Sequence, residues 1–164
     1  MSEAPLVPGK VAEHTICLLV KLGQVAFRLA EEGIGETGLR VRHYSVLQAL
    51  ADNGAMPQLA LGSFLRIDPA TMVTSLDDLE RAGYAERTRD PQDRRRYAVD
   101  ITDEGRKVLD DLNRRLVALD GDILTDLDST ERQSLHALLG SLAESPSLTA
   151  LFDSVRERTG AKGA

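Results

Sequence analysis

The sequence is poor in cysteine and in aromatic residues, and both shortages restrict what the protein can be. Cys17 is the only cysteine, so no disulfide can form within the chain, which is typical of proteins from a reducing compartment. Aromatic residues make up 4% of the chain, and tryptophan is absent. The core must therefore be built from Leu, Val, Ile and Ala, a composition that favours helices.

Long apolar runs are missing too. No apolar stretch approaches the length of about 20 residues that a membrane-spanning helix needs. The opening residues also lack the basic and apolar regions of a secretory signal peptide. We therefore expect a cytoplasmic protein that does not contact a membrane.

Signatures of catalysis and of metal binding are equally scarce. The three histidines, His14, His43 and His136, fall in separate helical segments, and the sequence has neither a glycine-rich phosphate loop nor a Gly-x-Ser-x-Gly motif. No Cys/His pair has the spacing of a zinc finger. A metal site shared by His14, Cys17 and the His43 of a dimer is the less favoured alternative. We expect no enzymatic activity, no metal and no cofactor.

Helical periodicity dominates what the sequence does contain. Apolar residues recur every three to four positions from Val11 to Glu32, which predicts a long helix that ends in the glycine-rich segment 33–38. Another helix begins at Thr102, and its apolar residues over 109–123 form a seam expected to pack along a further helix.

Two more helices are expected near the C-terminus. Thr130 and Gln133 have the spacing of a capping box, which predicts that a helix begins there. Ser145 and Pro146 end this helix, and a last helix follows them through Leu148.

The middle of the chain predicts a cluster of shorter helices. One includes residues 44–50, and the next begins near Pro57. A third begins with Asp68 as its N-cap and Pro69 as its first residue, and Gly83 supplies the left-handed residue past its end. The side chains expected to form its buried stripe are Met72, Leu76 and Leu79, with Val73 beside them.

The pattern then changes from helical to alternating. Residues 85–89 and 97–101 predict two strands joined by a turn at 90–93, with Arg94, Arg95 and Arg96 at the tip of the hairpin. The net charge of the chain is −6, but residues 81–96 contain six arginines and three acids. This segment carries +3 and leaves −9 for the rest, which indicates one face suited to an anion.

Two short helices followed at once by an arginine-tipped hairpin have the order of a winged helix-turn-helix. A helix fits the major groove of DNA, and a β-ribbon reaches the flanking minor groove. Thr71 and Thr74 suit hydrogen bonds to phosphates or base edges, and Ala70 suits a thymine methyl group. Arg94 or Arg95 suits a narrow minor groove, where the negative potential is strongest.

The same region resembles the MarR (multiple antibiotic resistance regulator) family of transcriptional regulators. Residues 68–74 and 79–83 carry part of the resemblance, and its strongest part runs from Arg87 to Arg96 and on through residues 99–105. An Asp-Arg-Arg wing tip followed by Ile-Thr-x-x-Gly is specific to this family.

The resemblance implies a mainly α-helical fold with a small β-hairpin wing, and a triangular homodimer joined through N- and C-terminal helices. It implies that the homodimer binds a roughly palindromic operator in double-stranded DNA, most often as a repressor that a small ligand or oxidation releases. In the family the aspartate of the wing braces the arginine inserted in the minor groove. Here those positions are Asp93 and Arg95.

We accordingly divide the chain into five parts. They are a flexible N-terminus (1–10), an N-terminal dimerisation helix (11–35), a winged helix-turn-helix region (39–101), C-terminal dimerisation helices (102–159) and a disordered tail (160–164). The residues expected at the DNA are Ala70, Thr71, Thr74, Asp77, Arg81, Arg87, Arg89, Asp93, Arg94, Arg95 and Arg96.

Alternatives remain open for regulation. Arg40, Arg42 and His43 lie near the position where family members hold aromatic acids, so they are candidates for a small aromatic or anionic effector. Ordinary surface charges are the alternative. Cys17 is a candidate for oxidation sensing, although its apolar neighbours favour a buried structural thiol. The acidic Asp78, at a position often basic in the family, supports a further alternative, a winged-helix interaction module without strong DNA binding.

Overall fold

The computed structural model describes residues 5–89 and 97–160. Its contacts divide the chain into two compact units, residues 1–120 and residues 121–164. The predicted tip of the hairpin and the predicted tail beyond residue 160 lie outside the described residues. Within the described ranges, no helix combines the length and the apolar character needed to cross a bilayer.

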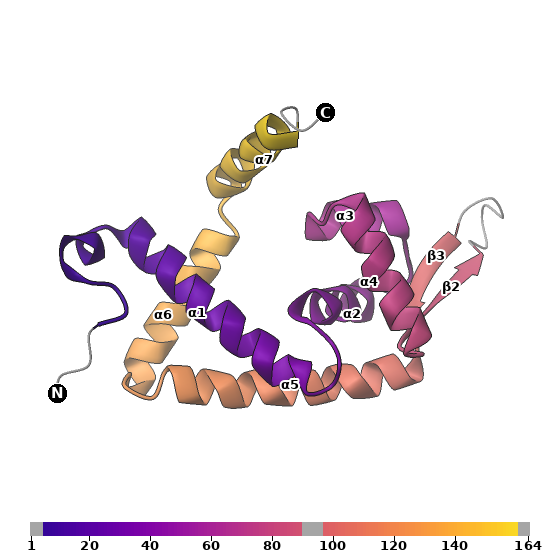
Figure 1. Cartoon of the computed structure of the whole chain (residues 1–164), viewed down its shortest axis with the longest axis horizontal. Coiled ribbons are helices and arrows are strands. Elements are labelled where there is room, and N and C mark those ends of the chain that lie inside the picture. The colour runs from indigo at the N-terminus through magenta and orange to yellow at the C-terminus, as the bar shows by residue number, and fades with distance from the viewer. Residues whose placement is uncertain (1–4, 90–96, 161–164) are drawn as a thin grey trace. The chain divides into compact units, whose positions relative to one another are not determined.

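The first unit combines helices with a three-stranded antiparallel sheet (Figure 1). Its elements are a 3-10 helix η1 (Gly9–Glu13), α1 (Thr15–Gly35), α2 (Val41–Asn53), β1 (Met56–Pro57), α3 (Gln58–Leu65), α4 (Pro69–Arg81), β2 (Ala85–Arg89), β3 (Tyr97–Ile101) and most of α5 (Asp103–Ile123). The second unit contains α6 (Ser129–Ala143) and α7 (Pro146–Gly160). The predicted mainly helical fold with a small hairpin is confirmed.

The sheet has the strand order β1-β3-β2. The hairpin pairs Ala85 with Ile101 at its base and Arg89 with Tyr97 at the last described pair. Strand β1 adds Met56 opposite Val99. A strand of two residues leaves no periodic signal, so the sequence did not predict it, yet it attaches the turn before α3 to the wing.

The core of the first unit lies between α2, α3, α4, the sheet and the beginning of α5. Leucines dominate it, as the shortage of aromatic residues predicted. Its fully buried side chains are Ile34, Leu47, Leu50, Leu61, Met72, Leu76, Leu79, Leu112, Val46, Val99 and Ser75. The predicted stripe of α4 is therefore buried. Burial of one large aliphatic side chain contributes about 1.5–3 kcal/mol, so this cluster fixes the positions of α3 and α4.

Helix α1 is longer at its C-terminus than the periodicity predicted. It continues through Gly33 and ends at Gly35, because the intervening Ile34 is buried in the core and its packing outweighs the low helix propensity of two glycines. The Glu31 carboxylate accepts a hydrogen bond of 2.9 Å from the backbone N–H of Val41, which joins the end of α1 to the start of α2. Arg115 of α5 binds Glu36 just beyond α1 at 2.5 Å.

Helix α4 begins as its sequence predicted. The Asp68 side chain accepts a 2.9 Å hydrogen bond from the backbone N–H of Thr71. Hydrogen bonding with the Thr71 side chain, followed by this backbone bond, lowers the pKa of the Asp68 carboxyl. Pro69 is the first helical residue, where its missing N–H costs nothing. Gly83 has φ +76°, the left-handed conformation expected just past a helix end.

The beginning of α5 is fastened to the turn between α4 and β2. The Thr102 hydroxyl donates to the Gly83 carbonyl at 2.7 Å and accepts from the backbone N–H of Gly105 at 3.0 Å. The Thr102 N–H donates to the Tyr84 carbonyl at 3.1 Å. A Cβ on Gly105 would overlap that carbonyl oxygen and lie 2.8 Å from Ile101 Cγ1. The Thr-x-x-Gly motif therefore permits close contact between α5 and the base of the wing.

In the second unit, the predicted start of α6 is wrong by two residues. Asp128, rather than Thr130, is the N-cap, and it forms the capping box with Glu131 instead of Gln133. The Asp128 carboxylate accepts from two backbone N–H groups, those of Thr130 and Glu131, at 2.8 and 2.9 Å. The carboxylate thus satisfies two backbone N–H groups that have no partner within the helix. The N-cap hydrogen bond of a threonine hydroxyl satisfies one.

Candidate nucleic-acid interface

Helices α3 and α4 are the two helices of a helix-turn-helix, and the exposed face of α4 is the candidate reading surface. Opposite the buried stripe, Ala70, Val73, Thr74 and Asp77 are exposed, whereas Thr71 is half-buried. Val73 is 42% exposed, so it belongs to the outer face and not to the edge of the core. We predicted it beside the buried stripe and not among the residues expected at the DNA, although its spacing of three from Ala70 and four from Asp77 was a usable signal.

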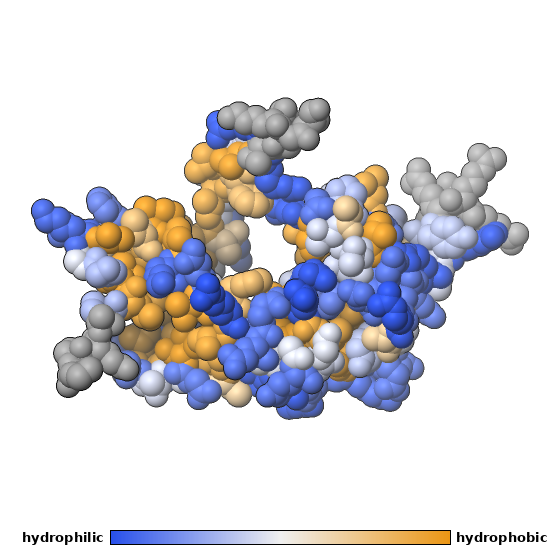
Figure 2. All heavy atoms as spheres, in the orientation of Figure 1, coloured by the Kyte–Doolittle hydropathy of each residue, from blue (hydrophilic) through white to orange (hydrophobic). Residues whose placement is uncertain are grey.

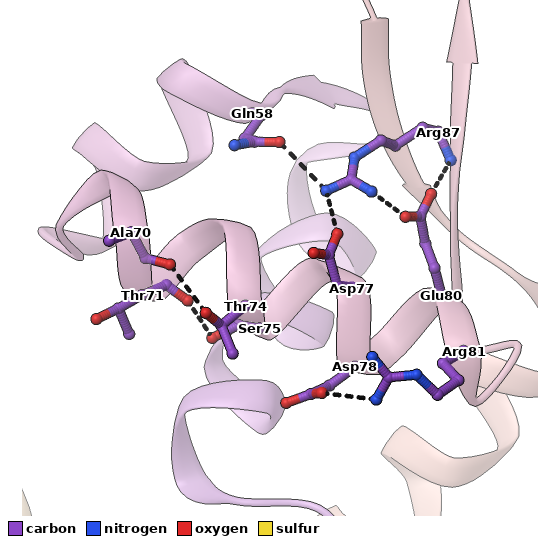
Figure 3. A network of polar contacts seen from close by, with 10 residues as sticks. All are labelled: Gln58, Ala70, Thr71, Thr74, Ser75, Asp77, Asp78, Glu80, Arg81 and Arg87. Carbon is purple, nitrogen blue, oxygen red and sulfur yellow. Dashed lines mark hydrogen bonds and ion pairs between the residues drawn. The ribbon is translucent and has the colours of Figure 1, made fainter.

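Arg87 and Asp77, both predicted to contact DNA, contact each other (Figure 3). The Arg87 guanidinium lies 3.0 Å from the Asp77 carboxylate and is also paired with Glu80, while the Arg87 backbone N–H donates to Glu80 Oε1 at 3.0 Å. A longer contact of 3.4 Å reaches Gln58 of α3. Arg87 thus ties the first strand of the wing to both helices of the helix-turn-helix. We call Arg87 and its three partners, Gln58, Asp77 and Glu80, the Arg87 cluster.

Asp78 forms a second polar link, between α4 and α2. Its carboxylate binds the exposed Arg81 at 3.1 Å and lies 3.7 Å from Arg42 and 3.5 Å from His43 Nε2. The acid that looked unfavourable on a DNA-reading helix therefore has three cationic or hydrogen-donating neighbours. Arg81 remains on the surface, and part of its charge is offset by Asp78.

His43 is buried, and its two ring nitrogens have different surroundings. Nδ1 accepts a hydrogen bond of 3.1 Å from the backbone N–H of Arg40, so the neutral ring carries its proton on Nε2. Nε2 faces Asp78 without a hydrogen bond of normal length, and the Nε of Arg42 is likewise buried without a partner. Burial, followed by the charge of Arg42, lowers the pKa of His43 below 6.5, and Asp78 offsets only part of this effect.

This lowered pKa predicts a pH dependence of stability. Below pH 6.5 the unfolded chain binds the His43 proton more tightly than the folded chain, so the free energy of unfolding falls as the pH decreases. In urea titrations at a series of pH values below 6.5, the free energy of unfolding of His43→Gln is expected to fall less steeply with decreasing pH than that of the wild type. His136→Gln, at an exposed position of α6, is the matched control, and an equal slope for His43→Gln and wild type would contradict the assignment.

The remaining arginines belong to the wing. Arg89 is exposed at the end of β2. Asp93, Arg94, Arg95 and Arg96 lie outside the described residues, so their predicted DNA contacts stay predictions.

Two of the residues predicted for regulation, Arg42 and His43, are brought together beside Asp78. Arg40 is exposed, whereas Arg42 and His43 point toward α4, as described above. Cys17 lies half-buried in an apolar hollow between the N-terminal segment and α1, which Pro8, Val11 and Val20 also line. These surroundings fit a structural thiol. Within the ranges described, no group of three or more His, Cys, Asp or Glu side chains is placed to hold a metal ion.

A capped reading helix, a supporting helix and a basic hairpin braced against them define a winged helix-turn-helix protein. The profile of the MarR family matches residues 39–97. The putative transcriptional regulatory protein for the hcr operon of Thauera aromatica is 32% identical over 148 residues, which cover 89% of this chain and 89% of that protein.

Solved structures agree with this match. A MarR family transcriptional regulator from Rhodococcus sp. RHA1 superimposes with a TM-score of 0.73 at 28% identity, covering 84% of this chain and 99% of that one. CouR from Rhodococcus jostii RHA1, solved with bound p-coumaroyl-CoA, has a TM-score of 0.69 at 30% identity, covering 84% and 96%. The chain belongs to the MarR family and is a transcriptional regulator. The relatives are regulators and not enzymes, as the sequence predicted.

Proposed function

We propose that the protein acts in the cytoplasm as a homodimeric repressor, binds a palindromic operator and is released by a small anionic or aromatic ligand. The observation that carries the proposal is the Arg87 cluster, which holds α3, α4 and the wing in one arrangement (Figure 3). A reading helix and a wing in fixed relation suit simultaneous contact with a major groove and the neighbouring minor groove.

Apolar surface on the described helices supports the homodimer. Ile16 and Phe27 on α1 are more than half exposed, and so are Leu138 on α6 and Leu151 on α7. Figure 2 shows apolar residues gathered over α1 and over α7. Exposed apolar surface of this kind mostly marks an interface between proteins. A twofold dimer also matches the symmetry of a palindromic operator.

The ligand is proposed to act at the link between α2 and α4. Arg42 and His43 offer two buried nitrogens without hydrogen-bond partners, and Asp78 is the acid nearest to both. The carboxylate of an aromatic acid, or a phosphate of an acyl-CoA thioester, would compete with Asp78 for Arg42. This competition would loosen α4 from α2. The p-coumaroyl-CoA bound by CouR shows that one relative takes an aromatic, anionic ligand.

The test of operator binding uses DNA from the promoter of the protein's own gene. We expect the purified wild type to shift this duplex with an affinity that falls steeply as salt rises, because bound arginines displace counterions from phosphates. Arg95→Ala is expected to weaken binding by about 1–3 kcal/mol. Absence of any shift at low salt would instead favour a winged-helix interaction module.

Release is measured on the same complex. Aromatic acids and aromatic acyl-CoA thioesters are added to the wild type and to Arg42→Met, with Arg106→Met, an exposed arginine of α5, as the matched control. A compound that releases the wild type and the control but not Arg42→Met supports the proposed ligand site. Equal release of all three would place the ligand elsewhere.

A further inference from the structure

The outer face of α4 offers few free hydrogen-bond donors to a base edge. The Thr74 hydroxyl donates to the Ala70 carbonyl at 3.1 Å, and the Ser75 hydroxyl donates to the Thr71 carbonyl at 2.8 Å (Figure 3). The arginine of the helix, Arg81, is paired with Asp78. The hydroxyls of Thr74 and Ser75 and the guanidinium of Arg81 are therefore already engaged within the protein, and the Thr71 side chain interacts with Asp68.

The acidic side chains near this face are engaged as well. Asp77 is paired with Arg87 of the wing, which offsets part of its charge. Asp68 is bound to the backbone of the first turn. Both carboxylates are thus committed in part to protein partners, which makes them poorer acceptors for a cytosine amino group, the base edge that such side chains normally recognise.

Apolar groups remain between these engaged side chains. Ala70 and Val73 are three residues apart, so their Cβ atoms lie about 5–6 Å from each other on the same face. Val73 is 42% exposed in the centre of the helix, with no packing role in the core. Neighbouring base pairs are about 3.4 Å apart, so the two side chains reach one or two adjacent base pairs.

We infer that Val73, with Ala70 beside it, is a specificity-determining residue that contacts a pyrimidine C5-methyl group in the major groove of each half-site. Thymine is the base that carries such a methyl in unmodified DNA, and 5-methylcytosine presents the same group. The inference rests on the proposed operator binding, and it predicts preference by apolar contact where hydrogen-bond readout is lacking.

The experiment begins with the duplex that the wild type selects from a randomised library. Thymines of each half-site are replaced one at a time by deoxyuridine, which removes only the methyl group. At one thymine per half-site, or two adjacent ones, we expect an affinity loss of about fourfold, as for one buried methyl-sized group. A cytosine at that position is expected to bind weakly, and 5-methylcytosine to recover part of the affinity.

A cycle with protein variants separates methyl contact from DNA shape. Val73→Ala is expected to bind the thymine duplex more weakly and to lose most of the deoxyuridine penalty. Val117→Ala, the same change at an exposed position of α5, should keep the full penalty. The inference is overturned, while operator binding stands, by either of two results. One is that deoxyuridine causes no loss of affinity in any of the proteins, and the other is that the loss is the same in Val73→Ala as in the wild type. Failure of the wild type to select any duplex removes operator binding itself.

Discussion

Gly105→Ala is expected to lower the free energy of unfolding by about 3 kcal/mol, at the upper end of the usual cost of overpacking. The added Cβ has no space, because the Tyr84 carbonyl oxygen and the Ile101 side chain occupy its position. Both neighbours belong to the base of the wing, and the oxygen is backbone that side-chain rotation does not move. Relief requires α5 to separate from the wing, which also disturbs the hydrogen bonds of Thr102. Urea unfolding followed by circular dichroism measures the loss.

Gly121→Ala is the matched control in the same helix. A Cβ at Gly121 meets nothing within 4 Å, so the substitution is expected to stabilise the protein by about 0.5–1 kcal/mol through helix propensity. Opposite signs for the two substitutions would show that the contact, rather than the loss of a glycine, decides the outcome. Similar stabilities for the two variants would refute the close packing of α5 on the wing.

Arg87→Met is expected to reduce both stability and operator affinity without changing the salt dependence of binding. Removal of the guanidinium leaves Glu80 and Asp77 without their partner. Because Glu80 is half-buried, we expect the free energy of unfolding to fall by about 1–2 kcal/mol after allowance for solvent screening. Affinity falls because the wing is no longer braced against α4. The slope of log affinity against log salt stays that of the wild type, since no phosphate contact is lost.

Arg89→Met supplies the contrast. Arg89 is exposed at the end of the same strand, so we expect little change in stability and a salt slope smaller by about one. Fluorescence anisotropy at several salt concentrations measures both slopes. A reduced slope for Arg87→Met would restore Arg87 to the set of direct DNA contacts that its sequence pattern predicted.

Local signals explain which elements were predictable. Asp68 and Pro69 define the start of α4 through interactions within one turn, so the sequence was sufficient there. The partners of Arg87 were not predictable in the same way. An arginine in a basic run is typical of a DNA contact, and its pairing with Glu80 depends on how the strand crosses the helix.

Two other differences have a similar physical origin. Strand β1 is two residues long and exists because β3 lies beside it, so no property of Met56 and Pro57 alone indicates a strand. The sequence pattern predicted Val73 beside the buried stripe of α4. Its exposure follows from the direction in which Met72 and Leu76 face, and a helical projection anchored on the Asp68 cap would have revealed it.

The internal pairing of arginines also has a kinetic consequence for the proposed operator complex. The two positive charges of Arg81 and Arg87 are outnumbered by the three negative charges of Asp77, Asp78 and Glu80, so α4 and its brace exert little net attraction on a phosphate backbone. Long-range steering then falls to the basic wing, and salt is expected to act chiefly on the association rate. The short-range fit of α4 into the groove governs how long the complex persists. Changes in the wing are therefore expected to alter the association rate, and changes on the outer face of α4 the dissociation rate.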